Sequence, residues 1–186
     1  DWILIREKYP KSYKVQNLFE DKKQIFERIL EISNKKVIIG NYYWSAFVRN
    51  KLLNDYDQKN SHAYYNVLEE AAIIGIDGTE WARTSGLDIK KEEINELIGL
   101  FQSFTPSFVK LAGKKYRVIN YLKDQFIYLK INEGGATISK TNKAFIIGIY
   151  SNTQHYCIDG KPKIQCIDMC STVVGNVANE LRKANY

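Results

Sequence analysis

The sequence predicts an α+β fold in which helices cover the faces of a mainly antiparallel sheet. Strand-like segments joined by short turns fill the middle of the chain, and amphipathic helical patterns lie on either side of them. The 186 residues are 45% hydrophobic and 26% charged, a composition with enough apolar surface to offset the entropy of the chain. At roughly 150 residues per domain, this length predicts one domain with an appendage.

The appendage is expected at the N-terminus, as an extension over residues 1–41 that precedes a main domain over residues 42–186. Apolar residues recur at helical spacing within residues 15–33, which predicts one amphipathic helix. A short apolar run over residues 37–39 then ends at Gly40. Nothing in this part of the sequence indicates catalysis.

A second helix is predicted over residues 43–54, with Asn41 as a possible N-cap. Its apolar residues recur at three- and four-residue spacing on one face: Trp44, Phe47, Val48 and Leu52. Residues 55–65 are polar and predict a loop. A hairpin is then predicted over residues 71–83, because Asp77-Gly78 tolerates the positive φ angles of a type I′ turn.

The remaining segments alternate in the same way between helix and strand patterns. Acidic and apolar residues are interspersed over residues 90–101, which predicts an amphipathic helix. Four further elements follow from β-rich segments and turn residues: a strand–turn–strand over 109–121, a strand over 125–131, a turn at Gly134-Gly135, and a hairpin over 136–150 with Asn142 in its turn.

The C-terminal part is predicted to be a polar loop over residues 151–161 followed by a helix, with Pro162 at the first helical position. The helix carries one continuous apolar stripe: Ile167, Cys170, Val174, Val177 and Leu181. A stripe of this kind indicates a helix that lies flat on a sheet.

Composition excludes several classes of function. The net charge of +6 is mild and no block of five like charges occurs, so a nucleic-acid arm is not indicated. No apolar run approaches the roughly 18 residues of a membrane span. The three cysteines are an odd number, which favours a reducing, intracellular setting over a disulfide framework.

Catalytic and metal-binding signals are weak. The two histidines, His62 and His155, lie in predicted loops without a nucleophile motif. Neither a Walker loop nor a GxGxxG motif occurs. His155 and the three cysteines, Cys157, Cys166 and Cys170, match none of the usual zinc spacings, so a metal centre is the weakest alternative. We therefore expect no enzyme, no catalytic residue, no cofactor and no metal.

The region from residue 42 to residue 186 resembles profilin. Five segments in order carry the resemblance: YWSAFV at 43–48, AAIIGIDGTEWA at 71–82, LAGKKY at 111–116, GGATISKT through GIY at 134–150, and the C-terminal stretch at 173–186. The resemblance implies a central antiparallel sheet with the N- and C-terminal helices on one face and smaller helices on the other. It also implies two binding functions, one for monomeric actin and one for proline-rich peptides.

The proline-peptide site implied by the resemblance is a groove of five residues: Trp44, Phe47, Trp81, Leu181 and Tyr186. A polyproline II helix is stiff before it binds, and its rings pack on flat aromatic side chains. Phe47 replaces the family's usual tyrosine, and Glu180 stands where relatives often carry histidine or an aromatic residue. Both departures imply weaker or altered affinity for proline.

The actin surface implied by the resemblance consists of a sheet edge with Lys115, Arg117 and Lys130 and of the last helix near Thr172, Val173 and Asn176. Such a protein is expected to be a cytoplasmic, cytoskeletal monomer.

The alternative function is a membrane-surface adaptor that binds phosphoinositides through Lys130, Arg182 and Lys183, aided by the extension. The predicted loop at 151–161 is longer than its family equivalent, and it either adds contacts with actin or obstructs them. Three roles stay open for the extension: a helix docked on the domain, an arm on actin, or a lid over the groove.

Overall fold

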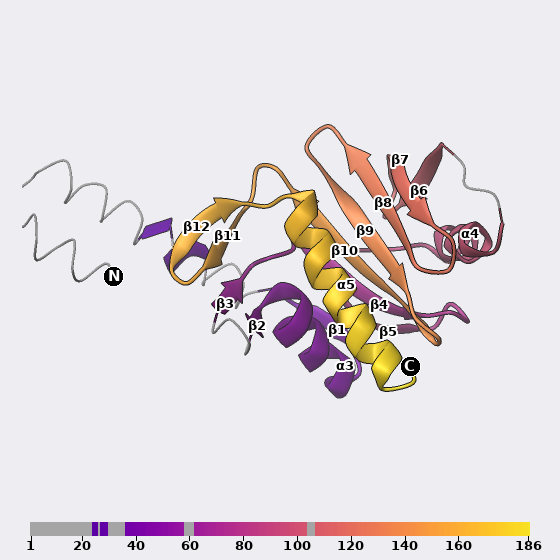
Figure 1. Ribbon diagram of the computed structural model, residues 1–186, viewed down its shortest axis with the longest axis horizontal. Helices are drawn as coiled ribbons and strands as arrows, with labels where there is room; N and C mark the ends of the chain where they lie inside the picture. Colours follow the sequence, from indigo (N-terminus) through magenta and orange to yellow (C-terminus); the bar gives the residue numbers. More distant parts are fainter. Residues whose placement is uncertain (1–23, 26, 30–35, 58–61, 104–106) are drawn as a thin grey trace, which may run out of the picture.

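The computed structural model describes residues 24–25, 27–29, 36–57, 62–103 and 107–186 (Figure 1). The helix predicted over residues 15–33 lies largely outside them, although residues 24–25 and 27–29 are helical. The central element is an eight-stranded antiparallel sheet with the order β1-β5-β4-β10-β9-β8-β7-β6. Its strands are β1 (Ile38–Gly40), β4 (Glu70–Gly75), β5 (Glu80–Thr84), β6 (Phe108–Leu111), β7 (Lys114–Leu122), β8 (Phe126–Ile131), β9 (Gly134–Lys140) and β10 (Ala144–Ser151).

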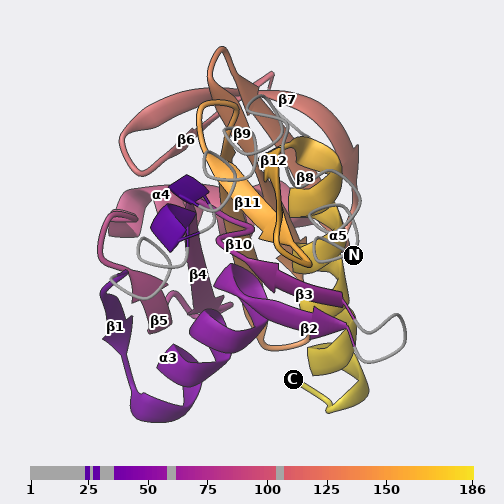
Figure 2. The same ribbon diagram turned by 90° about the vertical axis from the view of Figure 1, so that its left-hand side faces the viewer.

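Helices cover both faces of this sheet, which confirms the predicted α+β class. On one face lie α3 (Tyr42–Phe47), which continues as the π-helix η1 (Val48–Leu53), and α5 (Ile167–Lys183). On the other face lies α4 (Lys91–Gln102), over a separate hydrophobic core. The C-terminal end of α5 lies close to α3 in Figure 1, and in Figure 2 the residues after α5 lead back toward α3. The two ends of the region 42–186 therefore meet, with α5 in contact with η1.

Strand β1 shows that the end of the predicted extension is part of the sheet. Its residues pair with β5, from Ile38 opposite Thr84 to Gly40 opposite Ala82. Just before it, the Lys36 Nζ donates hydrogen bonds to the carbonyls of Leu68 and Glu69, at 2.7 and 2.6 Å. Burial lowers the pKa of Lys36 to about 8. Residues 36–40 are therefore anchored to the main domain.

The two predicted polar loops are wrong, because both contain strands of a second sheet. This sheet has the order β12-β11-β3-β2 and consists of β2 (Asp55–Asp57), β3 (His62–Tyr65), β11 (His155–Ile158) and β12 (Lys161–Ile164). Pro162 lies in β12, where it pairs with Cys157 of β11. It is therefore not the first residue of the last helix, which begins at Ile167 with Cys166 as its N-cap. Asp159 and Gly160, at φ +49° and +74°, make the turn of the β11–β12 hairpin.

Two predicted turns also differ in detail. The hairpin of β4 and β5 is confirmed, but only Gly78 of the Asp77-Gly78 pair has a positive φ, +85°, whereas a type I′ turn needs two. Gly134 and Gly135 lie inside β9 and not in a turn. A Cβ at Gly135 would collide with the Leu129 carbonyl oxygen and lie 2.8 Å from the ring of Tyr150, so this glycine is explained by the close approach of a neighbouring backbone and a neighbouring side chain.

Candidate functional site

Five aromatic rings from three parts of the chain gather where α3 meets the end of α5. This aromatic cluster consists of Tyr43, Trp44 and Phe47 of α3, Trp81 of β5, and the C-terminal Tyr186. The Trp44 ring centroid lies 4.6 Å from that of Trp81 and 5.4 Å from that of Tyr186. Trp81 and Tyr186 are 6.1 Å apart and nearly perpendicular. The structure thus brings the predicted groove residues together.

Local interactions hold the cluster in place. The Asn41 side-chain oxygen accepts a hydrogen bond from the Trp44 N–H at 2.9 Å and caps α3. The Tyr186 N–H donates to the Leu181 carbonyl at 2.9 Å, and its own carbonyl accepts from the Asn142 N–H at 3.0 Å. The C-terminal residue is therefore bound to the sheet through its backbone, and its ring is positioned against Trp44.

The rings differ in how much surface they offer to a ligand. Trp44 is 8% exposed and Leu181 3% exposed, so these two form the floor of the cluster. Phe47, Trp81 and Tyr186 are partly buried and pack against the same core. Tyr43 is 60% exposed, and its ring centroid lies 6.4 Å from that of Phe47. Tyr43 was not among the predicted groove residues, although its position one turn before Phe47 places it on the same side of the helix.

Charged groups border the cluster. The Lys143 Nζ lies 4.9 Å from the centroid of the Tyr186 ring, in cation–π geometry. Lys51 of η1 and Glu180 of α5 form an ion pair at 3.5 Å, and both side chains remain partly exposed. Glu180 therefore joins the two helices next to the rings, and it does not contribute an aromatic surface.

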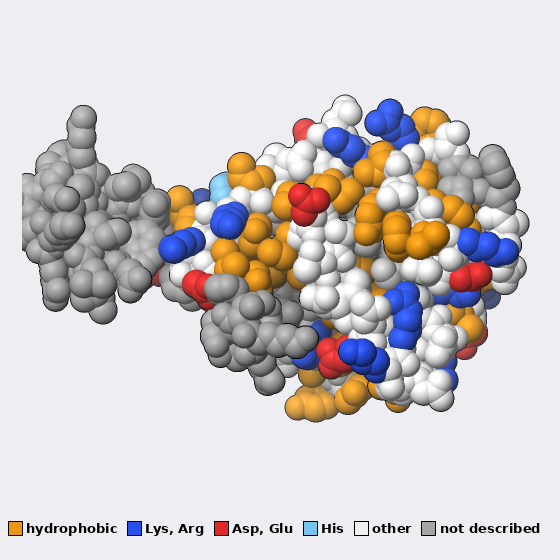
Figure 3. Space-filling model, viewed as in Figure 1, with side chains coloured by type: hydrophobic (Ala, Val, Ile, Leu, Met, Phe, Trp, Pro, Cys, Tyr) orange, Lys and Arg blue, Asp and Glu red, His pale blue; other side chains and the backbone are white. Residues whose placement is uncertain are grey.

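A second candidate surface lies on the same side of the main sheet, where α5 packs on β9 and β10 and leaves β8 and β7 open. Side chains alternate along a strand. In β8, Ile127 and Leu129 enter the core under α4, so Phe126, Tyr128 and Lys130 face the α5 side. The Phe126 and Tyr128 rings are stacked with centroids 4.4 Å apart. Figure 3 shows hydrophobic and basic side chains together over this side of the molecule. We call it the open sheet face.

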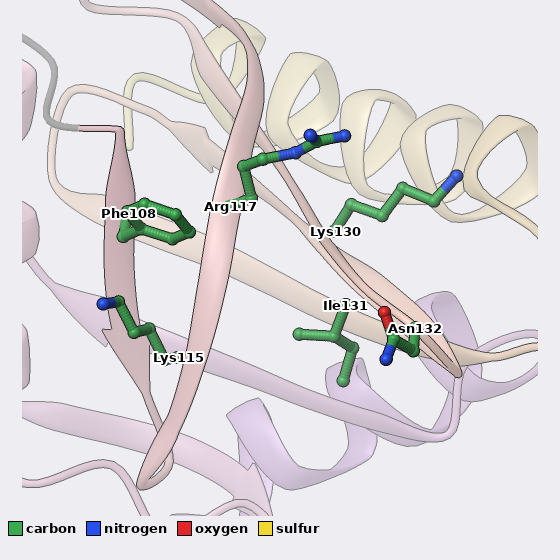
Figure 4. Close-up of a pocket in the computed structure, with 6 residues that line it drawn as sticks. All are labelled: Phe108, Lys115, Arg117, Lys130, Ile131 and Asn132. Carbon is green, nitrogen blue, oxygen red and sulfur yellow. The ribbon is translucent and has the colours of Figure 1, made fainter.

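The three basic residues predicted for the sheet edge surround one hollow of this face. Lys115, Arg117 and Lys130 line a space of about 610 Å³ together with Phe108, Ile131 and Asn132 (Figure 4). Arg117 of β7 is paired directly with Lys130 of β8. The Lys115 Nζ lies 4.4 Å from the Phe108 ring centroid. The arrangement gives a basic hollow next to a stacked aromatic pair, which suits acidic groups of a partner.

The predicted residues of the last helix are divided between surface and core. Thr172 and Asn176 are exposed, whereas Val173 is 3% exposed and belongs to the core under α5. Val173 is therefore corrected from a predicted contact residue to a core residue. The alternation arises because the helix packs flat on the sheet, with one face buried.

The three predicted lipid-binding residues do not form one patch. The Arg182 guanidinium donates to the Lys140 carbonyl and to Asn179 Oδ1, so it holds α5 on β9. Lys130 of β8 pairs with Gly135 of β9. In β9, Gly135 and Lys140 are five residues apart, which separates Lys130 from Arg182 by about 17 Å along the strand. Lys130 belongs instead to the basic hollow, and Arg182 and the exposed Lys183 lie at the far end of α5.

His155 and the three cysteines are separated by differences in burial. His155 is exposed, whereas Cys157 and Cys170 are buried. Burial raises the pKa of Cys157 to about 11 and that of Cys170 to about 12, so both thiols are protonated near neutral pH. Among the described residues, no three His, Cys, Asp or Glu side chains are grouped to hold a metal ion. In the same part of the chain, no helix has the length and apolar character needed to cross a membrane.

Comparisons with known proteins agree on one family. The family model described as Profilin matches residues 42–186. Among solved structures, Acanthamoeba castellanii profilin II is 26% identical over 64% of this chain and 89% of that chain, with a TM-score of 0.55. Acanthamoeba castellanii profilin IB is 25% identical with the same coverage and TM-score. Schizosaccharomyces pombe profilin shares the fold at 23% identity, 64% and 88% coverage and a TM-score of 0.54.

Proposed function

This chain belongs to the profilin family, and on that premise we propose that it binds monomeric actin and regulates actin polymerisation in the cytoplasm. The observation that carries the proposal is the open sheet face, where the basic hollow of Lys115, Arg117 and Lys130 lies next to the stacked rings of Phe126 and Tyr128. The exposed residues Thr172 and Asn176 of α5 extend the same side of the molecule. Aromatic and basic side chains on an open face are suited to a protein partner with acidic residues.

We propose also that the aromatic cluster binds proline-rich peptides, as the family resemblance implies. Support comes from the contacts among Trp44, Trp81 and Tyr186, which bring three aromatic rings together. Such rings accept the pyrrolidine rings of a polyproline II helix. The two sites share only α5, which carries Thr172 and Asn176 on the actin side and Leu181 in the floor of the aromatic cluster. Their other residues come from different elements, so one chain can hold actin and a proline-rich assembly factor together.

Separate substitutions test the two sites. Arg117→Glu is expected to weaken actin binding at least tenfold in a pyrene-actin polymerisation assay and to leave proline-peptide binding unchanged, because the charge is reversed only in the basic hollow. Tyr186→Ala is expected to do the reverse. It is a cleaner test than Trp44→Ala, because Trp44 is part of the core. Lys91→Glu is the matched control, since Lys91 is exposed on α4 at the opposite side of the sheet.

Equal loss of both activities in Arg117→Glu and Tyr186→Ala, with the fold preserved, would contradict the proposal of two separate surfaces. An effect of Lys91→Glu as large as that of Arg117→Glu would show that overall charge, and not the hollow, governs binding to actin.

Binding of phosphoinositide headgroups is a second candidate function, favoured by the basic hollow. Lys115 and Arg117 join Lys130 there, in place of Arg182 and Lys183. Co-sedimentation with vesicles that contain phosphatidylinositol bisphosphate tests it, with Arg117→Glu expected to reduce the bound fraction. A deletion of residues 1–35 tests the contribution of the extension and keeps Lys36 and β1 in place. Unchanged binding by Arg117→Glu would remove the hollow from this role.

A further inference from the structure

We propose that Tyr43 is a contact residue of the proline-peptide site and supplies the hydroxyl group that Phe47 lacks. The inference rests on the proposed function of the aromatic cluster. Tyr43 lies four residues before Phe47 on α3, with ring centroids 6.4 Å apart and planes inclined by 35°. Its ring meets that of Trp44 edge-on, at 5.0 Å and 84°. Tyr43 is thus a fifth ring of the cluster and extends it along the helix.

Exposure singles out Tyr43 within the cluster. It is 60% exposed and Trp44 only 8% exposed, so a peptide laid on the cluster meets Tyr43 over a larger area than the tryptophan beneath it. A polyproline II helix has no internal hydrogen bonds, and its carbonyls are free to accept from a donor on the protein. Phe47 offers no donor. The phenol of Tyr43 does, from a neighbouring position on the same side of α3.

Charged groups limit the aromatic surface at the other end of the cluster, which also favours a peptide that lies toward Tyr43. The Lys51–Glu180 ion pair lies beyond Phe47 along the helices, at 3.5 Å, and puts charged groups where the aromatic surface would otherwise continue. Four residues of helix span about 6 Å, which corresponds to about two residues of a polyproline II helix at about 3.1 Å each. Tyr43 therefore shifts the apolar contact surface by about two prolines toward the start of α3.

Binding of a fluorescein-labelled decaproline peptide, followed by fluorescence anisotropy on the full chain, tests this assignment. Tyr43→Ala is expected to raise the Kd about 5- to 10-fold, because a tyrosine beside the central rings of an interface carries part of the binding energy. Tyr43→Phe is expected to raise it about threefold, through loss of the hydroxyl donor alone. Tyr42→Ala is the matched control, because Tyr42 is the adjacent tyrosine and is 92% exposed.

The variants test separately the role of Tyr43, the role of its hydroxyl group and the peptide site itself. A Kd for Tyr43→Ala within twofold of the wild type, or raised equally in Tyr42→Ala, would overturn the role of Tyr43 and leave the proline-peptide site standing. A Tyr43→Phe variant equal to the wild type would overturn the hydroxyl contribution. If the wild-type chain itself does not bind decaproline, the proposed peptide site fails, and the assignment of Tyr43 fails with it. Circular dichroism of each variant shows whether the fold is kept.

Discussion

The position of Gly148 controls how closely α5 approaches the main sheet, and a single methyl group there tests the packing on which both candidate surfaces depend. Gly148 lies in β10 beneath α5. A Cβ at this position would lie 2.5 Å from Val174 Cγ2 and 2.8 Å from Leu68 Cδ1. Val174 and Leu68 are fully buried, so neither side chain has free space to move into. Gly148→Ala is therefore expected to push α5 away from the sheet.

The size of the effect follows from these distances. Carbon atoms in contact lie about 3.5–4.0 Å apart, so the helix must move by about 1 Å. Overpacking of a core costs about 1–3 kcal/mol, and the loss of a flexible glycine in the unfolded chain returns about 0.5–1 kcal/mol. With mid-range values, a net loss of about 1 kcal/mol remains, which lowers the Tm of a domain of this size by about 2–4 °C.

Melting curves by circular dichroism measure this change in Tm directly. Decaproline binding measures whether the displacement of α5 also affects the aromatic cluster. Because Tyr186 follows directly from α5 and packs against Trp44 at 5.4 Å, displacement of the helix is expected to weaken peptide binding as well. Gly175→Ala is the matched control: its Cβ meets no atom within 4 Å, and alanine in a helix interior is expected to stabilise by about 1 kcal/mol. A Tm for Gly148→Ala equal to or above that of the wild type would refute the reasoning.

Three further predictions concern the elements that support the site. Asn41→Ala removes the cap of α3, whose oxygen accepts from the Trp44 N–H at 2.9 Å, and is expected to cost about 1 kcal/mol in chemical unfolding. Glu93→Ala is expected to cost about 2–4 kcal/mol, because this buried carboxylate accepts two backbone hydrogen bonds of 2.9 Å from the β6–β7 turn. Lys36 has its pKa lowered by burial from 10.5 to about 8. Relative to Lys36→Met, the wild type is expected to gain about 2–3 kcal/mol of stability between pH 8 and about pH 10.

The sign for Lys36 follows from proton counting. Above pH 8 the folded chain has released the lysine proton and the unfolded chain still holds it, so stability rises with pH until the unfolded group also titrates. The comparison with the variant is needed because buried Cys157 and Tyr116 have raised pKa values and lower the stability of both chains at high pH. A pH-independent difference would contradict burial of a charged Lys36. If Asn41→Ala or Glu93→Ala has the same free energy of unfolding as the wild type, the corresponding hydrogen bonds do not contribute to stability, and the prediction is contradicted.

Elements whose signals are local can be predicted from the sequence alone. The periodicity of residues 43–54 predicted the helix, and Asn41 was recognised as a possible cap, because both signals lie within a few residues of the chain. The hairpin over residues 71–83 was predicted from Asp77-Gly78, although the turn uses one positive φ and not two. The family resemblance implies that Trp44, Trp81 and Tyr186 share one groove, and the structure brings their rings into contact.

The second sheet contradicts the two predicted loops, although the sequence carries a local signal for half of it. Asp159-Gly160 is the same kind of dipeptide as Asp77-Gly78, and both of its residues adopt positive φ. The other half is not readable locally, since β3 pairs with β11 across almost a hundred residues, as in Tyr65 opposite Cys157. Pairing over such separations depends on where the rest of the chain has folded.

Which residues of each predicted site face solvent depends on the assembled fold. Periodicity identifies the two sides of one element, but exposure depends on which other element covers each side. Thus Val173 lies on the buried face of α5, whereas its neighbour Thr172 is exposed. Arg182 is engaged with the Lys140 carbonyl, and Tyr43 is left open beside a nearly buried Trp44. The basic hollow exists for the same reason: β6, β7 and β8 extend beyond the edge of α5, and the width of a sheet relative to its covering helix is a property of the assembled fold.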